Sequence, residues 1–186
     1  MASAKLRIAG GSARGLPLTE PRGLRLRPTS GLVREAIFNI LDDTVAGAAV
    51  LDIYAGTGAL GIEALSRGAA RAVFIDAEAV CCQAILQSLS RAGFSDQAQV
   101  LRGRLPAALR TAEGRFDLVF MDPPYHEDTA AETLLLLSHK LAAGGAVVYE
   151  HGSRYNPPER PTGLVLTERR SYGDSAIAFY ALQEGE

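Results

Sequence analysis

Ala48-Ala49-Val50-Leu51-Asp52-Ile53, followed by Tyr54-Ala55-Gly56-Thr57-Gly58-Ala59-Leu60-Gly61, is the stretch that decides the fold of this chain. Its first part is an apolar run typical of a buried strand, and its second part is a glycine turn that leads into a helix ending near Arg67. Strand, glycine turn and helix start in this order let the backbone approach a ligand closely, with helix amides facing it. Gly56, Gly58 and Gly61 satisfy the pattern G-x-G-x-x-G.

An acidic residue follows at the spacing that this pattern requires. Asp76 lies 20 positions after Gly56 and closes a second predicted strand, Ala72–Ile75, where a carboxylate can bind ribose hydroxyls. Asp52 can order the glycine turn, meet an ammonium group of a cofactor, or act only as a helix-cap aspartate. The pattern predicts a nucleoside-containing cofactor and does not by itself separate a dinucleotide from S-adenosylmethionine.

A second motif, Met121-Asp122-Pro123-Pro124-Tyr125, follows the apolar run Phe116–Phe120, which is also predicted to be a buried strand. The two prolines restrict the backbone and remove two donors. The Asp122 carboxylate and the Pro123 carbonyl remain as acceptors beside the flat ring of Tyr125. This arrangement suits a planar heterocycle with an exocyclic amino group, whereas the simpler alternative is a Pro-Pro turn that only ends a strand.

The rest of the chain alternates strands and helices, which predicts an α/β fold with a doubly wound, mostly parallel sheet. In such a sheet, ligands bind outside the carboxyl ends of the strands where the strand order reverses. If the first and fourth strands are neighbours there, both motifs face one crevice. The further predicted elements are a helix from Thr29 or Ser30 to about Leu41, helix Ala77–Ala92, strand Gln99–Arg102, a short helix Leu105–Thr111, strand Phe116–Met121, helix Thr129–Leu141, strand Ala146–Tyr149, and a closing antiparallel pair, Leu164–Glu168 and Ala176–Ala181.

Length and charge predict two parts, a basic β-hairpin extension over residues 1–28 and one globular domain over residues 29–186. Residues 1–34 hold seven basic residues and one acidic residue, which gives them a net charge of +6. Because the net charge of the whole chain is −2, residues 35–186 carry a net charge of −8. A basic arm on an acidic body is typical of a protein with one face toward phosphate, although a solvated basic tail is the alternative. Arg34 and Glu35 either line the site or lie on a solvated flank.

Other features favour an intracellular enzyme without a metal. No apolar run approaches membrane-spanning length and no signal-peptide core is present, which predicts a cytoplasmic protein. The adjacent Cys81 and Cys82 are expected to be reduced, partly buried thiols. His126, His139 and His151 are isolated in sequence, so we expect surface or structural roles for them and no metal site.

The chain resembles the bacterial family of small-subunit ribosomal RNA guanine-N2 methyltransferases nearly end to end. Asp-Pro-Pro-Tyr is shared with adenine-N6 and other amino methyltransferases, so it indicates the chemistry and not the substrate. In many relatives the turn after the third strand offers an acidic or amide group to adenine, and here Arg104 stands in that place. The motifs that carry the resemblance are Arg7–Gly11, Arg27-Pro28-Thr29, Val33-Arg34-Glu35 with Phe38-Asn39, Ala55–Gly61, Glu63–Arg67, Asp122–Tyr125 and Tyr172-Gly173-Asp174.

The resemblance implies S-adenosylmethionine-dependent methyl transfer to the N2 amino group of a guanine, with small-subunit ribosomal RNA or an assembling subunit as partner. The implied catalytic residues are Asp122, Pro123, Pro124 and Tyr125. The expected cofactor contacts are Asp52, Tyr54, Ala55, Gly56, Thr57, Gly58, Gly61, Asp76, Ala77, Arg104 and Leu105. The expected RNA contacts are Lys5, Arg7, Arg14, Arg25, Arg27 and Arg34. The alternatives are a DNA adenine-N6 methyltransferase, a non-catalytic RNA-binding or ribosome-assembly module, and, more distantly, a dinucleotide oxidoreductase.

Overall fold

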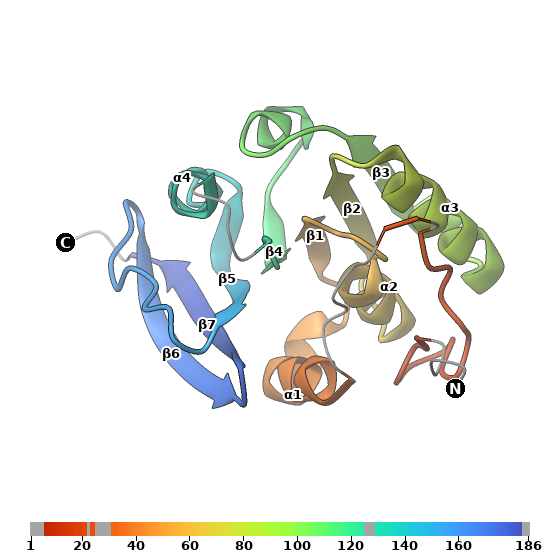
Figure 1. Cartoon of the computed structure of the whole chain (residues 1–186), viewed down its shortest axis with the longest axis horizontal. Helices are drawn as coiled ribbons and strands as arrows, with labels where there is room; N and C mark the ends of the chain where they lie inside the picture. Colours follow the sequence, from red (N-terminus) through yellow and green to blue (C-terminus); the bar gives the residue numbers. More distant parts are fainter. Residues whose placement is uncertain (1–5, 22, 25–30, 125–128, 184–186) are drawn as a thin grey trace.

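The computed structural model describes residues 6–21, 23–24, 31–124 and 129–183. Within them the chain forms a seven-stranded sheet of order β3-β2-β1-β4-β5-β7-β6 (Figure 1). The five strands from β3 to β5 are parallel, and β7 is antiparallel to both of its neighbours. The strands are β1 Ala49–Ile53, β2 Arg71–Asp76, β3 Ala98–Arg102, β4 Phe116–Met121, β5 Leu141–Gly152, β6 Leu164–Tyr172 and β7 Ser175–Leu182. The predicted mostly parallel sheet with an antiparallel closing pair is confirmed.

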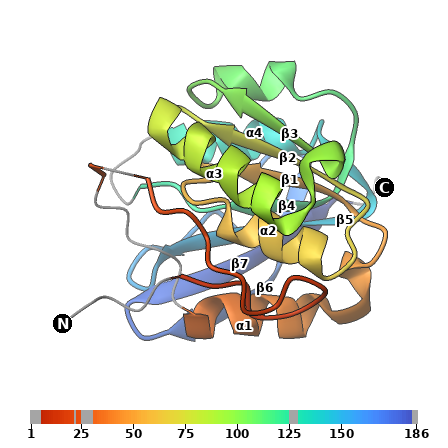
Figure 2. The same cartoon turned by 90° about the vertical axis from the view of Figure 1, so that its right-hand side faces the viewer.

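Helices cover both faces of the sheet, as expected for a doubly wound fold. Strand residues alternate between two cores because successive side chains point to opposite faces. Val50, Leu118 and Phe120 belong to one core, and Leu51, Val119 and Met121 belong to the other. The first core is covered by helices α1 (Gly31–Leu41), α2 (Ala59–Ser66) and α3 (Ala79–Ala92), with the short 3₁₀ helices η1 (Asp42–Val45) and η2 (Ser95–Gln97) at its margin. The second core is covered by the 3₁₀ helix η3 (Ala107–Thr111) and by helix α4 (Thr129–Leu137) (Figures 1 and 2).

The region after α4 differs from the sequence prediction. The helix expected to reach Leu141 ends at Leu137, and the strand expected to begin at Ala146 begins at Leu141. The cause is tertiary: Leu141 pairs with Phe116 of β4, and the register then shifts before Leu118 pairs with Ala146. A Cβ atom at Gly145 would lie 2.8 Å from the Asp117 carbonyl oxygen, so this glycine permits close backbone approach inside an irregular strand.

The amino-terminal segment forms a short hairpin, as predicted, with one antiparallel bridge between Arg7 and Pro17. Hydrogen bonds from the Ile8 amide to the Leu16 carbonyl (3.0 Å) and from the Leu18 amide to the Leu6 carbonyl (2.9 Å) close it. Ile8 and Leu18 are buried in the same core as α1, α2 and α3, and the hairpin lies along that helical face (Figure 2). The described part of the extension is therefore packed onto the main domain.

Several predictions fall on residues outside the described ranges, namely those for Lys5, Arg25, Arg27, Thr29, Ser30, Tyr125 and His126. None of the helices in the described part of the chain is long and apolar enough to cross a membrane.

Candidate functional site

The two predicted motifs emerge at one edge of the sheet. Strands β1 and β4 are parallel neighbours at the point where the strand order reverses, as expected. The last residue of β1, Ile53, is in register with Ile75 of β2 and with Met121 of β4. Parallel strands lie about 4.8 Å apart. The glycine turn, Asp76 and Asp122 therefore leave the sheet side by side at its carboxyl edge.

The glycine turn has the backbone conformation that its sequence requires. Gly56 and Gly58 have φ of 54° and 72°, in the left-handed region that glycine adopts without strain. Tyr54 also has a positive φ, 56°, which is uncommon for a residue with a side chain and often marks a functional site. The Gly58 amide donates to the Ala55 carbonyl (2.6 Å), which closes the turn before α2 begins.

Asp52 holds the start of α2. Its Oδ2 accepts a hydrogen bond from the Gly61 amide at 2.9 Å, which supports the expectation that it orders the turn. Burial raises the pKa of the Asp52 carboxyl to about 8, and the charge of Asp76 adds to that shift. A Cβ atom at Gly61 would lie 2.3 Å from the ring of Phe74, so glycine is required where α2 crosses β2.

Asp76 organises the neighbouring turns. Its Oδ2 accepts from the Gly56 amide (2.7 Å) and its Oδ1 from the Glu78 amide (2.8 Å). Burial raises the pKa of this carboxyl also, against the opposite effect of both hydrogen bonds. The Gly103 amide donates to the Asp76 carbonyl (2.9 Å), which brings the turn after β3 to the same edge. Asp76 thus connects three of the loops predicted to hold a cofactor.

The remaining predicted cofactor residues lie in the turns that follow β1, β2 and β3. Ala55, Thr57 and Leu105 are buried or partly buried, whereas the Arg104 side chain is exposed and its carbonyl accepts from the Ala108 amide (3.0 Å). Ala77 directly follows β2 and is half-buried. No described contact gives the Arg104 side chain a part in the site, so its predicted role stays a prediction.

The Asp122 loop begins where β4 ends. Asp122 is half-buried, Pro123 is buried and Pro124 is exposed. Burial raises the pKa of the nearby Tyr149 phenol on β5, and Tyr155, Tyr54 and Asp122 are among the neighbours that raise it further. The Tyr54 hydroxyl lies 3.2 Å from Oγ1 of Thr133 in α4, a contact that connects the β1 turn to the helix after the Asp122 loop. Sequence reasoning did not single out Thr133 or Tyr149, because only the sheet order brings them here.

The structure corrects the role predicted for Arg34. Its side chain is 4% exposed, Nη2 donates to the Arg7 carbonyl (2.6 Å), and Nε lies 3.7 Å from Oε2 of Glu63. Burial lowers the pKa of this guanidinium, with the Glu63 charge acting in the opposite direction. A buried guanidinium inside the fold cannot contact RNA phosphates, so we remove Arg34 from the predicted RNA contacts.

Of the other arginines in that set, Arg7 and Arg14 are described and both are exposed. Arg7 donates from Nη1 to the Gly15 carbonyl across the hairpin (2.7 Å). Both side chains are therefore accessible to a partner on the hairpin surface.

Glu63 joins the hairpin to α2, a role that sequence reasoning did not assign. Its oxygens accept from the Ala9 and Gly10 amides, each at 2.7 Å, and from Nε of Arg67 at 2.9 Å. The side chain is fully buried. In the sequence, an acidic residue within an otherwise apolar helix could have indicated this role, because a buried carboxylate requires hydrogen-bond donors or a positive charge as partners.

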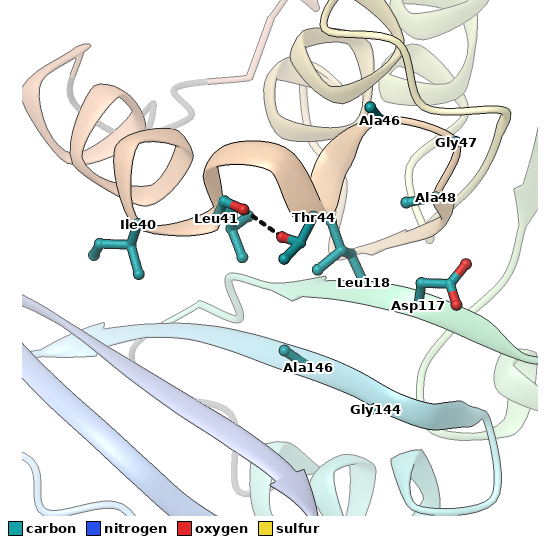
Figure 3. Close-up of a pocket in the computed structure, with 10 residues that line it drawn as sticks. All are labelled: Ile40, Leu41, Thr44, Ala46, Gly47, Ala48, Asp117, Leu118, Gly144 and Ala146. Carbon is teal, nitrogen blue, oxygen red and sulfur yellow. Dashed lines mark hydrogen bonds between the residues drawn. The ribbon is translucent and has the colours of Figure 1, made fainter.

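A hollow elsewhere on the surface lies away from this edge. It is lined by residues at the amino ends of β1 and β4, among them Ala48, Asp117 and Leu118, together with Gly144 and Ala146 of β5 (Figure 3). In Figure 3 the Thr44 hydroxyl donates to the Leu41 carbonyl beside it. Because the strands are parallel, this hollow is at the opposite end of the sheet from the glycine turn. The described residues contain no group of three or more metal-ligating side chains.

Comparisons with known proteins show the family to which this chain belongs. Residues 6–181 match the family model described as Conserved hypothetical protein 95. The ribosomal RNA small subunit methyltransferase D of Escherichia coli strain K12 is 35% identical over 182 residues, which span 96% of this chain and 90% of that protein. The solved structure of yhhF from Escherichia coli has a TM-score of 0.85 at 33% identity and covers 97% of this chain and 99% of its own.

A more distant solved structure, SMU.776 complexed with SAH, shares the fold alone. It is 13% identical, has a TM-score of 0.66, and covers 81% of this chain and 48% of its own.

Proposed function

Because the chain belongs to the ribosomal RNA small subunit methyltransferase D family, we propose that it transfers a methyl group from S-adenosylmethionine to the N2 amino group of a guanine in small-subunit ribosomal RNA. The observation that carries this proposal is the register of β1 and β4. It brings the glycine turn and the Asp122 loop to the same edge of the sheet, where the strand order reverses.

Electrostatics at the glycine turn favours a cationic cofactor. In dinucleotide enzymes the first amides of the helix bind a pyrophosphate. Here the Gly61 amide in the first turn of α2 already donates to the buried carboxyl group of Asp52. Asp52 and Asp76 are both buried enough to have raised pKa values. A positive charge stabilises such carboxylates and a pyrophosphate would oppose them, so this donor set fits S-adenosylmethionine better than NAD.

Each loop at this edge has a part in holding that cofactor. Asp76, at the end of β2, is suited to ribose hydroxyls, and the backbone at Gly56 and Gly58 allows close approach. The turn after β3, held by the Gly103 amide, can meet the adenine through backbone atoms. When bound, S-adenosylmethionine supplies a methyl group on a good leaving group, so the protein has to orient the acceptor rather than activate the donor.

The Asp122 loop prepares the acceptor. The exocyclic nitrogen of guanine is a weak nucleophile because its lone pair is delocalised into the ring. The Asp122 carboxylate and the Pro123 carbonyl can each accept a hydrogen bond from one N–H group of this nitrogen. These hydrogen bonds favour a pyramidal nitrogen with an available lone pair. Tyr125 lies outside the described residues, and its proposed role is to stack on the base and hold the plane of the base. This mechanism depends on orientation and electrostatics, and the amine proton passes to Asp122 or to water.

The amino-terminal hairpin supplies RNA contacts in this proposal. Arg7 and Arg14 are exposed on its surface. Lys5, Arg25 and Arg27 lie outside the described residues and complete the proposed set. The target base has to leave its stack to reach the site, which RNA loops allow at low cost. Because the substrate is ribosomal RNA or an assembling subunit, we place the protein in the cytoplasm.

Nucleoside mapping tests the proposal. Small-subunit RNA from cells that lack this protein is incubated with the purified protein and labelled S-adenosylmethionine, digested, and analysed by mass spectrometry. We expect one N2-methylguanine that is absent without the protein. A methylated adenine or no incorporation into RNA would contradict the assignment. Parallel reactions with duplex DNA test the adenine-N6 alternative, because only a DNA methyltransferase would label it.

A further inference from the structure

Three rings meet at the carboxyl end of β5, beside the Asp122 loop. Tyr149 and His151 belong to β5, and Tyr155 follows in a turn closed by a hydrogen bond from its amide to the Gly152 carbonyl (2.9 Å). The ring centroids lie 5.2 Å apart for Tyr149 and His151, 5.7 Å for His151 and Tyr155, and 6.5 Å for Tyr149 and Tyr155. We call these three residues the aromatic cluster.

Strand register positions the cluster next to the proposed site. Tyr149 pairs with Met121, the residue directly before Asp122. Strand β5 continues beyond this pair to Gly152, so His151 lies past the end of β4, at the level of the Asp122 loop. Tyr155 and Asp122 both lie close enough to the Tyr149 phenol to raise its pKa. The cluster and the loop are therefore adjacent parts of the same edge.

Exposure differs sharply within the cluster. Tyr149 and His151 are buried, whereas Tyr155 is 46% exposed. Tyr155 meets both neighbours nearly edge-on, with interplanar angles of 71° and 72°. These edge contacts hold its ring at the surface. An exposed aromatic ring is a platform on which any nucleobase can stack, because every base has a π-face.

Two exposed arginines, Arg154 and Arg169, belong to or contact the turn that carries this ring. Nη2 of Arg169 in β6 donates to the carbonyls of Ser153 (2.7 Å) and Tyr155 (3.1 Å), which anchors the turn. Arg154, next to Tyr155, is exposed. Exposed guanidinium groups beside an aromatic ring match the alternating phosphates and bases of a single strand.

The cluster also contains a polar atom without a partner. Nδ1 of His151 lies 2.8 Å from the Gly152 carbonyl oxygen, and since a carbonyl only accepts, Nδ1 carries the proton. Nε2 is therefore a bare acceptor, and it is buried without a hydrogen-bond partner in the described part of the structure. Buried acceptors of this kind are rare in folded proteins and are found where a ligand or water completes the site.

We propose that the aromatic cluster binds an unstacked RNA base next to the target nucleotide, with Tyr155 as the stacking platform. Arg154 and Arg169 attract the flanking phosphates, and His151 Nε2 is an unpartnered acceptor within the same cluster. This inference rests on the proposed function and adds to it a second RNA-binding surface, on the part of the chain that carries a net negative charge.

Fluorescence tests this inference directly, because the chain contains no tryptophan. Tyr155→Trp introduces a single fluorophore at the platform, and Leu86→Trp introduces one at an exposed position of α3 as the control. Both variants are titrated with unmethylated small-subunit ribosomal RNA while a mobility-shift assay follows binding. We expect quenching at position 155 and none at position 86. Bound RNA with unchanged emission at position 155 overturns the inference and leaves the proposed function intact.

Kinetics supplies a second measurement. Loss of one stacking contact corresponds to roughly a five- to hundredfold change in affinity. We expect Tyr155→Ala to raise KM for RNA by that factor with kcat largely retained, and Tyr155→Phe to behave as wild type. If the wild-type protein methylates protein-free RNA, quenching by assembled subunits but not by that RNA would overturn the assignment in favour of a ribosomal protein contact. Absence of RNA methylation by the wild-type protein would overturn both proposals.

Discussion

At the scale of single residues, the proposed site contains two carboxyl groups with different expected tasks. Asp122 stands at the end of β4 beside the loop prolines, where it can accept from a substrate amine. Asp52 is buried and holds α2 through the Gly61 amide. Asp122 is predicted to bind the substrate amine. Asp52 is predicted to stabilise the start of α2 and to attract the positive charge of the cofactor.

Asp122→Ala should abolish methyl transfer and leave cofactor binding intact. Removal of one group that stabilises a transition state lowers kcat by roughly 10²–10⁴-fold. Calorimetric titration with S-adenosylmethionine and a methyl-transfer assay measure the two properties separately. Asp96→Ala, at an exposed carboxylate in η2, is the control and should retain activity. Methyl transfer that survives in Asp122→Ala would refute the role.

Cofactor affinity should rise with pH. Burial raises the pKa of Asp52 to about 8, so this carboxyl is protonated at pH 6 in the free protein. A bound cation favours the ionised form, so binding releases a proton and affinity rises by up to about tenfold per pH unit until the free-protein pKa is reached. Calorimetry in buffers of different ionisation enthalpy detects that proton. Asp52→Asn should reduce the pH dependence, because Asp76, whose pKa is also raised, remains. A flat profile in the wild type would contradict this prediction.

The same shift affects folding with a definite sign. An acid whose pKa is higher in the folded state binds its proton more tightly there than in the unfolded chain. The contribution of Asp52 to the free energy of unfolding is therefore present below pH 4 and is lost as pH rises toward 8.

At the scale of secondary-structure elements, α2 is fixed at both ends. Its start packs against β2 at Gly61, and its end binds the amino-terminal hairpin through Glu63 and Ser66. The Ser66 carbonyl accepts from the Ser12 amide (2.7 Å), and the Ser66 hydroxyl accepts from the Ala13 amide (2.9 Å). Helix α2 thus connects the predicted RNA-binding arm to the predicted cofactor site.

Gly61→Ala should destabilise the fold and weaken cofactor binding. The added Cβ would meet the Phe74 ring at 2.3 Å, so α2 or the ring has to move. Overpacking of this kind costs about 1–3 kcal/mol. Gly31→Ala is the matched control, because nothing lies within 4 Å of a Cβ there. Urea unfolding compares the two variants, and equal midpoints would contradict the proposed packing constraint.

Glu63→Ala should release the hairpin from α2. The change removes the acceptor of the Ala9 and Gly10 amides and leaves the buried Arg34 charge without its anion. Breaking a buried ion pair in this way costs about 3–5 kcal/mol. Urea unfolding measures the loss, and hydrogen exchange at the two amides reports the release. Glu132→Ala, at an exposed position of α4, should have little effect. Unchanged exchange at Ala9 and Gly10 would show that Glu63 does not hold the hairpin.

At the scale of the whole molecule, the proposed RNA contacts lie on two surfaces, the amino-terminal hairpin and the aromatic cluster at the end of β5. The hairpin packs on the helical face formed by α1, α2 and α3 (Figure 2), whereas Tyr149 of the cluster belongs to the core covered by α4.

The paired change Arg7→Gln and Arg14→Gln should weaken RNA binding and its dependence on salt. Each phosphate contact contributes about 0.7–0.9 to the slope of log affinity against log salt concentration. We therefore expect a shallower slope with unchanged cofactor affinity. Arg110→Gln, at an exposed position of η3 on the other face, is the control. An unaltered slope in the paired variant would exclude the hairpin from the RNA interface.

The sequence predicted the mostly parallel sheet and its element order, and it predicted that both motifs meet at one edge on the condition that the first and fourth strands are neighbours, which the structure supplied. Those features follow from local signals: apolar strands, glycine at the turn, and two prolines after β4. The same signals were weaker at the ends of elements, and α4 and β5 begin or end several residues from their predicted limits because β4 and β5 pair with an irregular register.

Only the tertiary structure decided the roles of Arg34, Glu63 and the aromatic cluster. Arg34 belongs to a basic stretch in sequence, yet it is buried against Glu63, and Glu63 in turn binds amides 53 and 54 positions away. His151 has no other histidine near it in sequence, and strand β5 and the turn after it bring its ring into contact with Tyr149 and Tyr155. Burial and long-range pairing determine whether a charged or polar side chain serves the fold or a partner, and the local pattern of residues does not contain that information.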